Sequence, residues 1–270
     1  MPLIEGQAIC VRTWDWSETS QTAVLLSENH GMIRVLAKGS KRDRSAFSGG
    51  LELCTLGHMA AIVRPNSELA LLTQWDLVEP MLGIRKNLLT YNAGMLGIDL
   101  IPRLIQDHDP HPEVHNALCS LLKLCNDPPV HEDAELETTI MGMLAWYQWT
   151  ILVAVGAMPI VDHDVLTGEP LTPADVYGFS AQLGGITQDP ITTRYAYPDH
   201  AQSQAEGVWR IRAQTVEMMN SLGQSPPISR FLTGSKIQTL RIAKLLGAYI
   251  RERTGTDIPA MDWLLNPRSD

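Results

Sequence analysis

Five basic side chains lie close together in an otherwise acidic chain: Arg34, Lys38, Lys41, Arg42 and Arg44. The whole sequence carries a formal net charge of -9 at pH 7, so solubility does not require this local excess of cations. Clustered Lys and Arg side chains bind anions, and a phosphate backbone is the commonest such ligand. The cluster therefore predicts a nucleic-acid-binding loop. Without a fold to position it, the same run would also be typical of a solvated loop.

Aromatic side chains flank this basic loop in the sequence. Trp14 and Trp16 alternate around an aspartate after Arg12, and Phe47 follows the last cation. A groove for single-stranded nucleic acid needs cations for the phosphates and flat side chains on which bases stack. We predict that Arg12, Trp14, Trp16 and Phe47 contribute to such a groove. Core packing is an equal alternative for each tryptophan, and Phe47 could instead pin the loop to the protein.

A second basic group lies far along the chain, in the C-terminal half. It consists of Arg210, Arg212, Lys236, Arg241 and Lys244. Arg241 and Lys244 are three residues apart, so they would share one helix face. A solvated helix face is the simplest interpretation of these charges. The functional alternative is a binding surface for an acidic partner or for DNA.

The elements that must position the first basic cluster are strands. Alternating apolar residues predict strands over Gly6–Arg12, Thr22–Ser27, Met32–Ala37, Leu51–Val63 and Glu68–Leu77. Five short strands in the first 80 residues, with a long connection between the third and fourth, favour a Greek-key barrel of the OB type. The tryptophans would then lie in the first connecting loop, which OB proteins use for ligands.

After Pro80 the apolar period becomes helical, so we predict an α+β protein with a barrel domain (1–80) and a helical domain (81–270). An irregular insertion rich in Pro, Gly and Asp is expected at about 158–200. The predicted helices are Ile84–Gln106, Glu113–Cys125, Ala134–Val155, Ala201–Leu222 and Lys236–Thr254.

Neither a signal peptide nor an apolar run of membrane-spanning length is apparent, and we expect a cytoplasmic, nucleoid-associated protein. None of the four cysteines forms a Cys-x-x-Cys pair, so all four are expected to be buried as small apolar side chains. We find no Gly-rich phosphate loop and no nucleophile elbow, and we expect neither an enzyme nor a cofactor.

The order of these segments resembles the RecO family of recombination mediators. The similarity rests on "RTWDWSET", "ENHGMIRVLAKGSKR" and "LTQWDLVEP" in the first half, and on "GAMPIVD", "FSAQLGGI" and "LRIAKLLGAYIRERTG" in the second. Each motif is loose by itself, but their order and spacing are specific, and together they cover nearly the whole chain. The resemblance implies an OB domain followed by a helical domain.

The sequence departs from this family at one place. Many RecO proteins carry four zinc-binding cysteines in the irregular segment, whereas this chain has none there. Asp162, His163, Asp164 and Asp189 occupy the corresponding region, but they lack the thiolates that make structural zinc sites tight. We therefore predict that this chain has lost the metal.

The resemblance implies a nonenzymatic DNA-repair mediator. Such a protein would bind single- and double-stranded DNA without sequence preference and anneal complementary strands. It would also help load recombinase onto DNA coated with single-strand-binding protein, with a RecR-like partner. The second basic group would receive the acidic tail of single-strand-binding protein. Two alternatives are a protein adaptor whose DNA binding is weak or lost, and an enzyme that uses Asp162, His163 and Asp164.

Overall fold

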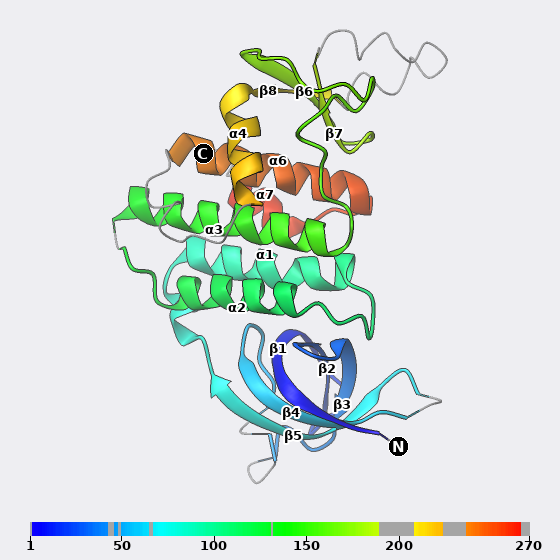
Figure 1. Cartoon of the computed structure of the whole chain (residues 1–270). Coiled ribbons are helices and arrows are strands. Elements are labelled where there is room, and N and C mark those ends of the chain that lie inside the picture. Colours follow the sequence, from blue (N-terminus) through cyan, green and yellow to red (C-terminus); the bar gives the residue numbers. More distant parts are fainter. Residues whose placement is uncertain are drawn as a thin grey trace. The chain divides into compact units, whose positions relative to one another are not determined.

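The computed structural model describes residues 2–42, 46–47, 50–64, 67–130, 132–188, 208–223 and 236–265. Its N-terminal part is a barrel of five strands (Figure 1): β1 (Leu3–Asp15), β2 (Gln21–Ser27), β3 (Gly31–Ala37), β4 (Leu56–Ile62) and β5 (Ala70–Glu79). The barrel closes in the order β1-β2-β3-β5-β4, with β3 and β5 parallel and every other pair antiparallel. This arrangement confirms the predicted OB-type barrel in an α+β chain.

Alternating residues of each strand fill the barrel. The interior includes Ala8, Cys10, Ala23, Val35 and Trp75, all at most 1% exposed. Residues one position along from these face outward, because successive side chains of a strand point to opposite faces. The fourth strand begins later than predicted, since Leu51–Thr55 form a loop that packs against β1 through the Cys10 N–H to Thr55 carbonyl hydrogen bond (2.9 Å).

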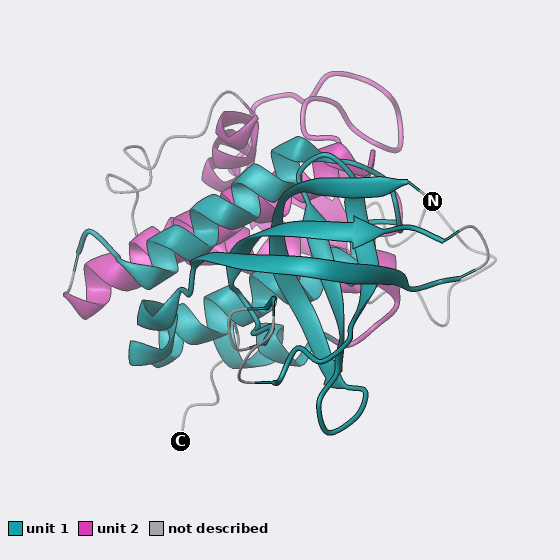
Figure 2. Cartoon of the chain, turned by 90° about the horizontal axis from the view of Figure 1, so that it is seen from below, with its two compact units in different colours: residues 1–131, 258–270 teal, residues 132–257 magenta. Residues whose placement is uncertain are grey.

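Helices pack directly on the barrel. After a 3-10 turn (Leu82–Lys86) come α1 (Leu88–Leu104) and α2 (Pro112–Asn126), and both contact β1. The last helix, α7 (Pro259–Leu265), contacts α1. The first compact unit is therefore Met1–His131 with Ile258–Asp270, coloured teal in Figure 2. The compact unit extends beyond residue 80, where the strands end, because the apolar faces of α1 and α2 are buried against it.

The second compact unit, Glu132–Asp257, combines helices with a small sheet. Its helices are α3 (Asp133–Ala154), α4 (Ala213–Leu222) and α6 (Lys236–Thr254), and α3 packs on α6. Its strands β6 (Val176–Ser180), β7 (Gly185–Thr187) and β8 (Val208–Arg212) form an antiparallel sheet in the order β7-β6-β8. No helix within the described residues is long and apolar enough to cross a membrane.

Two predictions for this second unit are wrong. Part of the segment predicted to be irregular forms β6 and β7, and Val208–Arg212 is a strand where we expected a helix. The reason is aromatic packing across the sheet. Phe179 of β6 stacks on Trp209 of β8 (centroids 5.8 Å apart) and meets Tyr249 of α6 edge-on at 5.5 Å. This packing agrees with the local sequence, since Val208, Trp209 and Ile211 are strand formers, and the predicted helix was wrongly extended over them. Residues 189–207 lie outside the described part.

Three of the four cysteines are buried as predicted, and Cys119 is half-buried. Burial raises the pKa of Cys54 to about 12 and raises the pKa of the Cys10 and Cys125 thiols further. These thiols are therefore protonated at neutral pH and behave as small apolar side chains.

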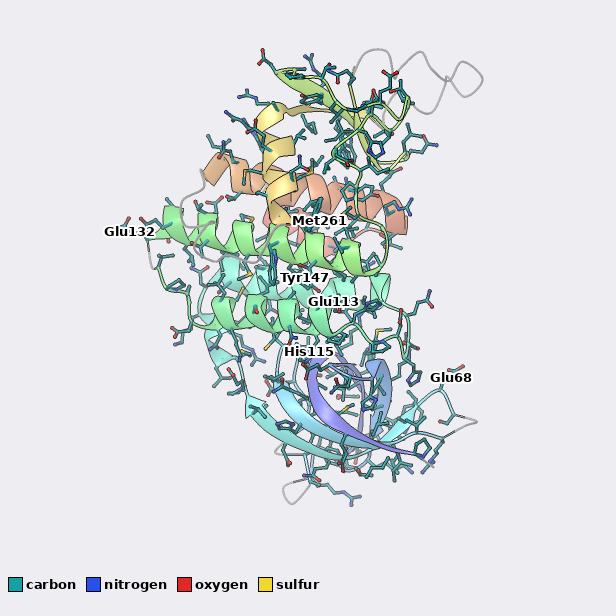
Figure 3. All side chains as sticks on the ribbon, in the orientation of Figure 1. Glu68, Glu113, His115, Glu132, Tyr147 and Met261 are labelled. Carbon is teal, nitrogen blue, oxygen red and sulfur yellow. The ribbon has the colours of Figure 1, made fainter. Side chains whose placement is uncertain are left out.

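A buried histidine lies on α2 where that helix packs on the barrel. His115, labelled in Figure 3, is fully buried, and its Nε2 has no hydrogen-bond partner among the described residues. Burial lowers the pKa of His115, although Asn116 and Glu28 act in the opposite direction. The folded chain therefore holds this imidazole neutral while the unfolded chain protonates it near pH 6.5.

We expect the free energy of unfolding to fall as the pH drops below about 6.5. The imidazole of the unfolded state then binds a proton, whereas the buried imidazole of the folded state does not. The loss can reach about 1.4 kcal/mol per pH unit and stops at the lower pKa of the folded state. The free energy of unfolding, measured with urea between pH 7.5 and pH 5, should therefore change more with pH for the natural chain than for His115→Gln. Equal pH dependence of the two proteins would contradict this assignment.

Candidate nucleic-acid interface

The strand register brings the predicted DNA-binding residues of β1 and β3 onto one face. Arg12 of β1 pairs with Val24 of β2, which pairs in turn with Arg34 of β3. Residues directly opposite each other in an antiparallel pair lie on the same face of the sheet. Since Ala23 and Val35 point into the barrel, this row points outward. Val24 between them is 1% exposed, because α1 and α2 pack on this side of β1 and β2. Only the half-exposed side chains of Arg12 and Arg34, at the two ends of the row, reach solvent.

A second outward row lies next to the first. Trp14 pairs with Thr22, and Thr22 pairs with Leu36. Two residues further along, the backbone N–H of Trp16 donates to the Ser20 carbonyl (2.9 Å). Lys38 follows the end of β3. We call this outer surface of β1, β2 and β3 the three-strand face.

Both tryptophans of this face are exposed. Trp14 is 48% and Trp16 is 62% exposed, so core packing, the alternative left open by the sequence, is wrong for both. Their spacing of two residues along an extended chain separates them by about 6.6 Å. That distance suits successive bases of an extended single strand, which stack on aromatic side chains irrespective of sequence.

The basic loop is attached to the loop between β1 and β2. The Lys41 N–H bonds the Thr19 carbonyl (3.1 Å), and the Gly39 N–H bonds the Ser20 hydroxyl (3.1 Å). Gly39 has a φ of +70°, and the Arg42 side chain lies directly over it. These contacts place Lys41 and Arg42 beside Trp16, at one end of the three-strand face.

Three of the predicted cations already form ion pairs. Arg12 pairs with Asp99 of α1 (2.7 Å) and Arg34 pairs with Asp107 after α1 (2.8 Å). Lys41 pairs with Asp15 at 2.5 Å. Among the described residues, no ion pair involves Lys38 or Arg42, and both are exposed. These two side chains are therefore the most available to a phosphate.

Sequence reasoning missed these three aspartates. Asp99 and Asp107 lie 87 and 73 residues from the arginines that they pair with, and no local pattern indicates such contacts. Asp15 was noticed only as the residue between the two tryptophans. The pairs of Arg34 and Lys41 are exposed and contribute at most about 1 kcal/mol, so a phosphate can compete with the carboxylate there. Asp99 is largely buried and also binds Arg103, so the pair of Arg12 is held more firmly.

The prediction that Phe47 contributes to the DNA-binding groove is wrong. Its side chain is only 4% exposed and packs in the barrel interior with Leu51. Burying the apolar ring stabilises the loop more than leaving it in water, so Phe47 anchors the loop and offers no face for stacking. Arg44 lies outside the described residues.

The second basic group is divided between two elements. Arg210 and Arg212 are exposed on β8, on the opposite side of the strand from Trp209 and Ile211. Arg241 and Lys244 lie on α6, where Arg241 is exposed and Lys244 half-buried. Lys236 begins α6. A role for these residues in partner binding remains a prediction.

The acidic residues that the sequence offered for a metal or for catalysis lie in the second unit, where Asp164 stabilises the backbone through hydrogen bonds. Asp164 is buried, and its carboxylate accepts hydrogen bonds from the backbone N–H groups of Leu166 (2.7 Å) and Gln188 (2.8 Å). His163 contacts Asp162 (Nδ1 to Oδ1, 2.6 Å). Within the described ranges, no three Asp, Glu, Cys or His side chains are arranged to hold a metal ion, and Asp189 lies outside them. The residues present do not fit the zinc site of many RecO proteins.

Comparison with known families accounts for this architecture. The model described as "Recombination protein O N terminal" matches residues 1–81, and the one described as "Recombination protein O C terminal" matches residues 85–261. The chain belongs to the RecO family. The boundary between the two matches falls in the turn between β5 and α1, where the sequence changes from strand to helix.

Individual RecO relatives agree with this assignment. The chain is 30% identical over 219 residues to "DNA repair protein RecO" of Syntrophobacter fumaroxidans, covering 81% of this chain and 77% of that protein. It is 28% identical over 182 residues to the protein of the same name from Anaeromyxobacter sp., covering 67% and 68%. A 35% identical match to the Rhodopirellula baltica protein spans 43% of each chain.

Proposed function

We propose that this chain is a nonenzymatic DNA-repair mediator that binds single-stranded DNA on the three-strand face. The observation that carries the proposal is the exposure of Trp14 and Trp16 at the end of β1, next to the basic loop that is bonded to the β1–β2 connection. The strand register adds Arg12 and Arg34 on the outside of the barrel. Cations lower the repulsion between strand and protein, and the indole rings hold bases without reading them. Binding should then show no sequence preference.

Annealing follows from the same electrostatics. Cations near Trp16 would reduce the repulsion between two backbones, and base pairing would supply the specificity. By analogy with its family, the chain would also help exchange single-strand-binding protein for recombinase together with a RecR-like partner. Arg210, Arg212, Lys236, Arg241 and Lys244 are our proposed site for the acidic tail of single-strand-binding protein.

One observation favours a second candidate, the protein adaptor. Three predicted DNA-binding cations are paired with Asp15, Asp99 and Asp107, and these carboxylates would repel a phosphate backbone. A chain in which these pairs persist would bind DNA weakly, and its barrel would serve a protein partner. Measured DNA affinity separates the two proposals.

An annealing assay tests the mediator proposal. Two complementary oligonucleotides should pair faster with the natural chain than without it, and Lys38→Ala/Arg42→Ala should lose most of that acceleration, roughly tenfold. The control Arg210→Ala/Arg212→Ala makes the same change in net charge on the second unit. Equal acceleration by the Lys38→Ala/Arg42→Ala variant and the natural chain would remove the three-strand face from the annealing step.

A further inference from the structure

A continuous groove runs between the end of β1 and helix α1, within the first compact unit. It consists of two adjoining hollows of about 740 and 430 Å³ that share Thr13, Leu53 and Met95 in their walls. Tyr91 lines the larger hollow and Trp14 lines the smaller one. The volume of each hollow falls in the range of small-molecule sites, about 300–1,000 Å³. We call it the β1–α1 groove.

The groove exists because β1 extends beyond the part that pairs with β4. The pairing of β1 with β4 ends at Ile9 and Leu56, so the last residues of β1 have no strand on that side. The loop around Leu53 fills only part of the space toward α1. On the helix side, Leu88, Tyr91 and Met95 recur at spacings of three and four residues and therefore share one face.

This helix face is apolar yet open. Leu88 is 69% and Tyr91 is 40% exposed, which is unusual for large side chains on one face of a helix that packs on a core. Exposed apolar surface that lines a groove indicates a ligand or partner. An aromatic ring in each hollow suits a ligand with flat apolar faces.

The groove continues directly from the three-strand face. Trp14 belongs to the outward row of that face and also lines the groove. Arg12 lies beside it and is held by Asp99, which Arg103 also contacts (Nη2 to Oδ2, 3.0 Å). A guanidinium has five N–H donors, so the ion pair of Arg12 leaves donors available for a phosphate at the mouth of the groove.

We propose that the β1–α1 groove receives nucleobases of the single strand, with Tyr91 as a stacking platform beyond Trp14. The proposal rests on the proposed function, since the strand must first lie on the three-strand face. It assigns the path of the DNA strand, which runs from the basic loop past Trp16 and Trp14 and then over Arg12 into the groove. Met95 and Leu53 offer apolar contact to the bases in both hollows. The ion pairs Glu52–Arg85 and Asp99–Arg103 form the charged part of the walls.

Photo-crosslinking tests this path. An oligothymidylate of about 12 nucleotides, within the site sizes of OB domains, would carry 4-thiothymidine and be irradiated on the full chain. We expect crosslinked peptides that contain Tyr91 or Met95 in addition to those that contain Trp14 or Trp16. Crosslinks confined to the tryptophans and the basic loop would overturn the proposal while leaving the proposed function intact.

Affinity gives a second readout. Tyr91→Ala should weaken binding of the same oligonucleotide by about tenfold, because stacking is worth about 1–3 kcal/mol per base, while Tyr91→Phe should bind like the natural chain. The control is Met158→Ala, which removes a 47% exposed apolar side chain of the second unit, outside the residues that line the groove. Unchanged affinity of Tyr91→Ala would leave the groove to a peptide and overturn the proposal. Absence of any binding by the natural chain would reject the proposed function together with this inference.

Discussion

Replacing both exposed tryptophans, Trp14→Ala/Trp16→Ala, should weaken single-stranded DNA binding by about 100-fold. Each ring offers one stacking face, and stacking contributes about 1–3 kcal/mol per base, or roughly tenfold for each tryptophan. Both side chains lie on the outer surface at the end of β1, so their removal costs little core packing. Fluorescence anisotropy of a labelled oligothymidylate measures the affinity.

Two controls separate stacking from a general effect. The double change Trp14→Phe/Trp16→Phe keeps a flat ring at each position and should retain most of the affinity. Met158→Ala, on the second unit, should retain all of it. Thermal unfolding should show that the fold survives in each variant. Full binding by the double alanine variant would mean that bases do not stack on the three-strand face.

A large effect on stability is expected at Gly31, where β3 begins. Gly31 has a φ of +69°, and a Cβ there would overlap the backbone of Asp109. The chain comes this close because the His108 N–H donates to the Met32 carbonyl (2.9 Å) and fixes the α1–α2 connection against β3. Gly31→Ala should therefore lower the free energy of unfolding by about 2–4 kcal/mol, combining backbone strain with overpacking.

Gly156 provides the matched control for this change. It has nearly the same φ, +68°, but a Cβ at that position would meet nothing within 4 Å. Gly156→Ala should cost only the conformational strain, about 1 kcal/mol. Urea unfolding measures both values. Equal losses for the two substitutions would show that the approach of Asp109 to Gly31 is not tight.

The barrel could be predicted because each strand shows a local pattern of apolar and turn residues in the sequence. Alternating apolar residues and turn residues indicated all five strands, and their number and connection lengths indicated the OB class. Strand ends were less accurate, since Leu51–Thr55 reads as strand but forms a loop held by Cys10. The strand β8 was missed because the predicted helix Ala201–Leu222 was extended over Val208–Arg212, although the alternation of this segment favours a strand. Packing of Trp209 on Phe179 stabilises that strand.

The candidate site was predictable by residue type but not by geometry. The sequence indicated Arg12, Arg34 and both tryptophans, and only the register of β1, β2 and β3 shows that they share a face. The sequence left Phe47 between base stacking and anchoring the loop, and its burial decides for anchoring. The ion pairs with Asp99 and Asp107 were equally hidden, since they join segments far apart in the chain.

The salt dependence of DNA binding tests the central claim most directly. The association constant of an oligothymidylate would be measured at several salt concentrations for the natural chain and for Lys38→Ala/Arg42→Ala. For single strands, log K falls with log salt by about 0.7 per phosphate contact, so the variant should show a slope shallower by about 1.4. The same slope for both proteins, or a shallower slope only for Arg210→Ala/Arg212→Ala, would contradict phosphate binding at the three-strand face.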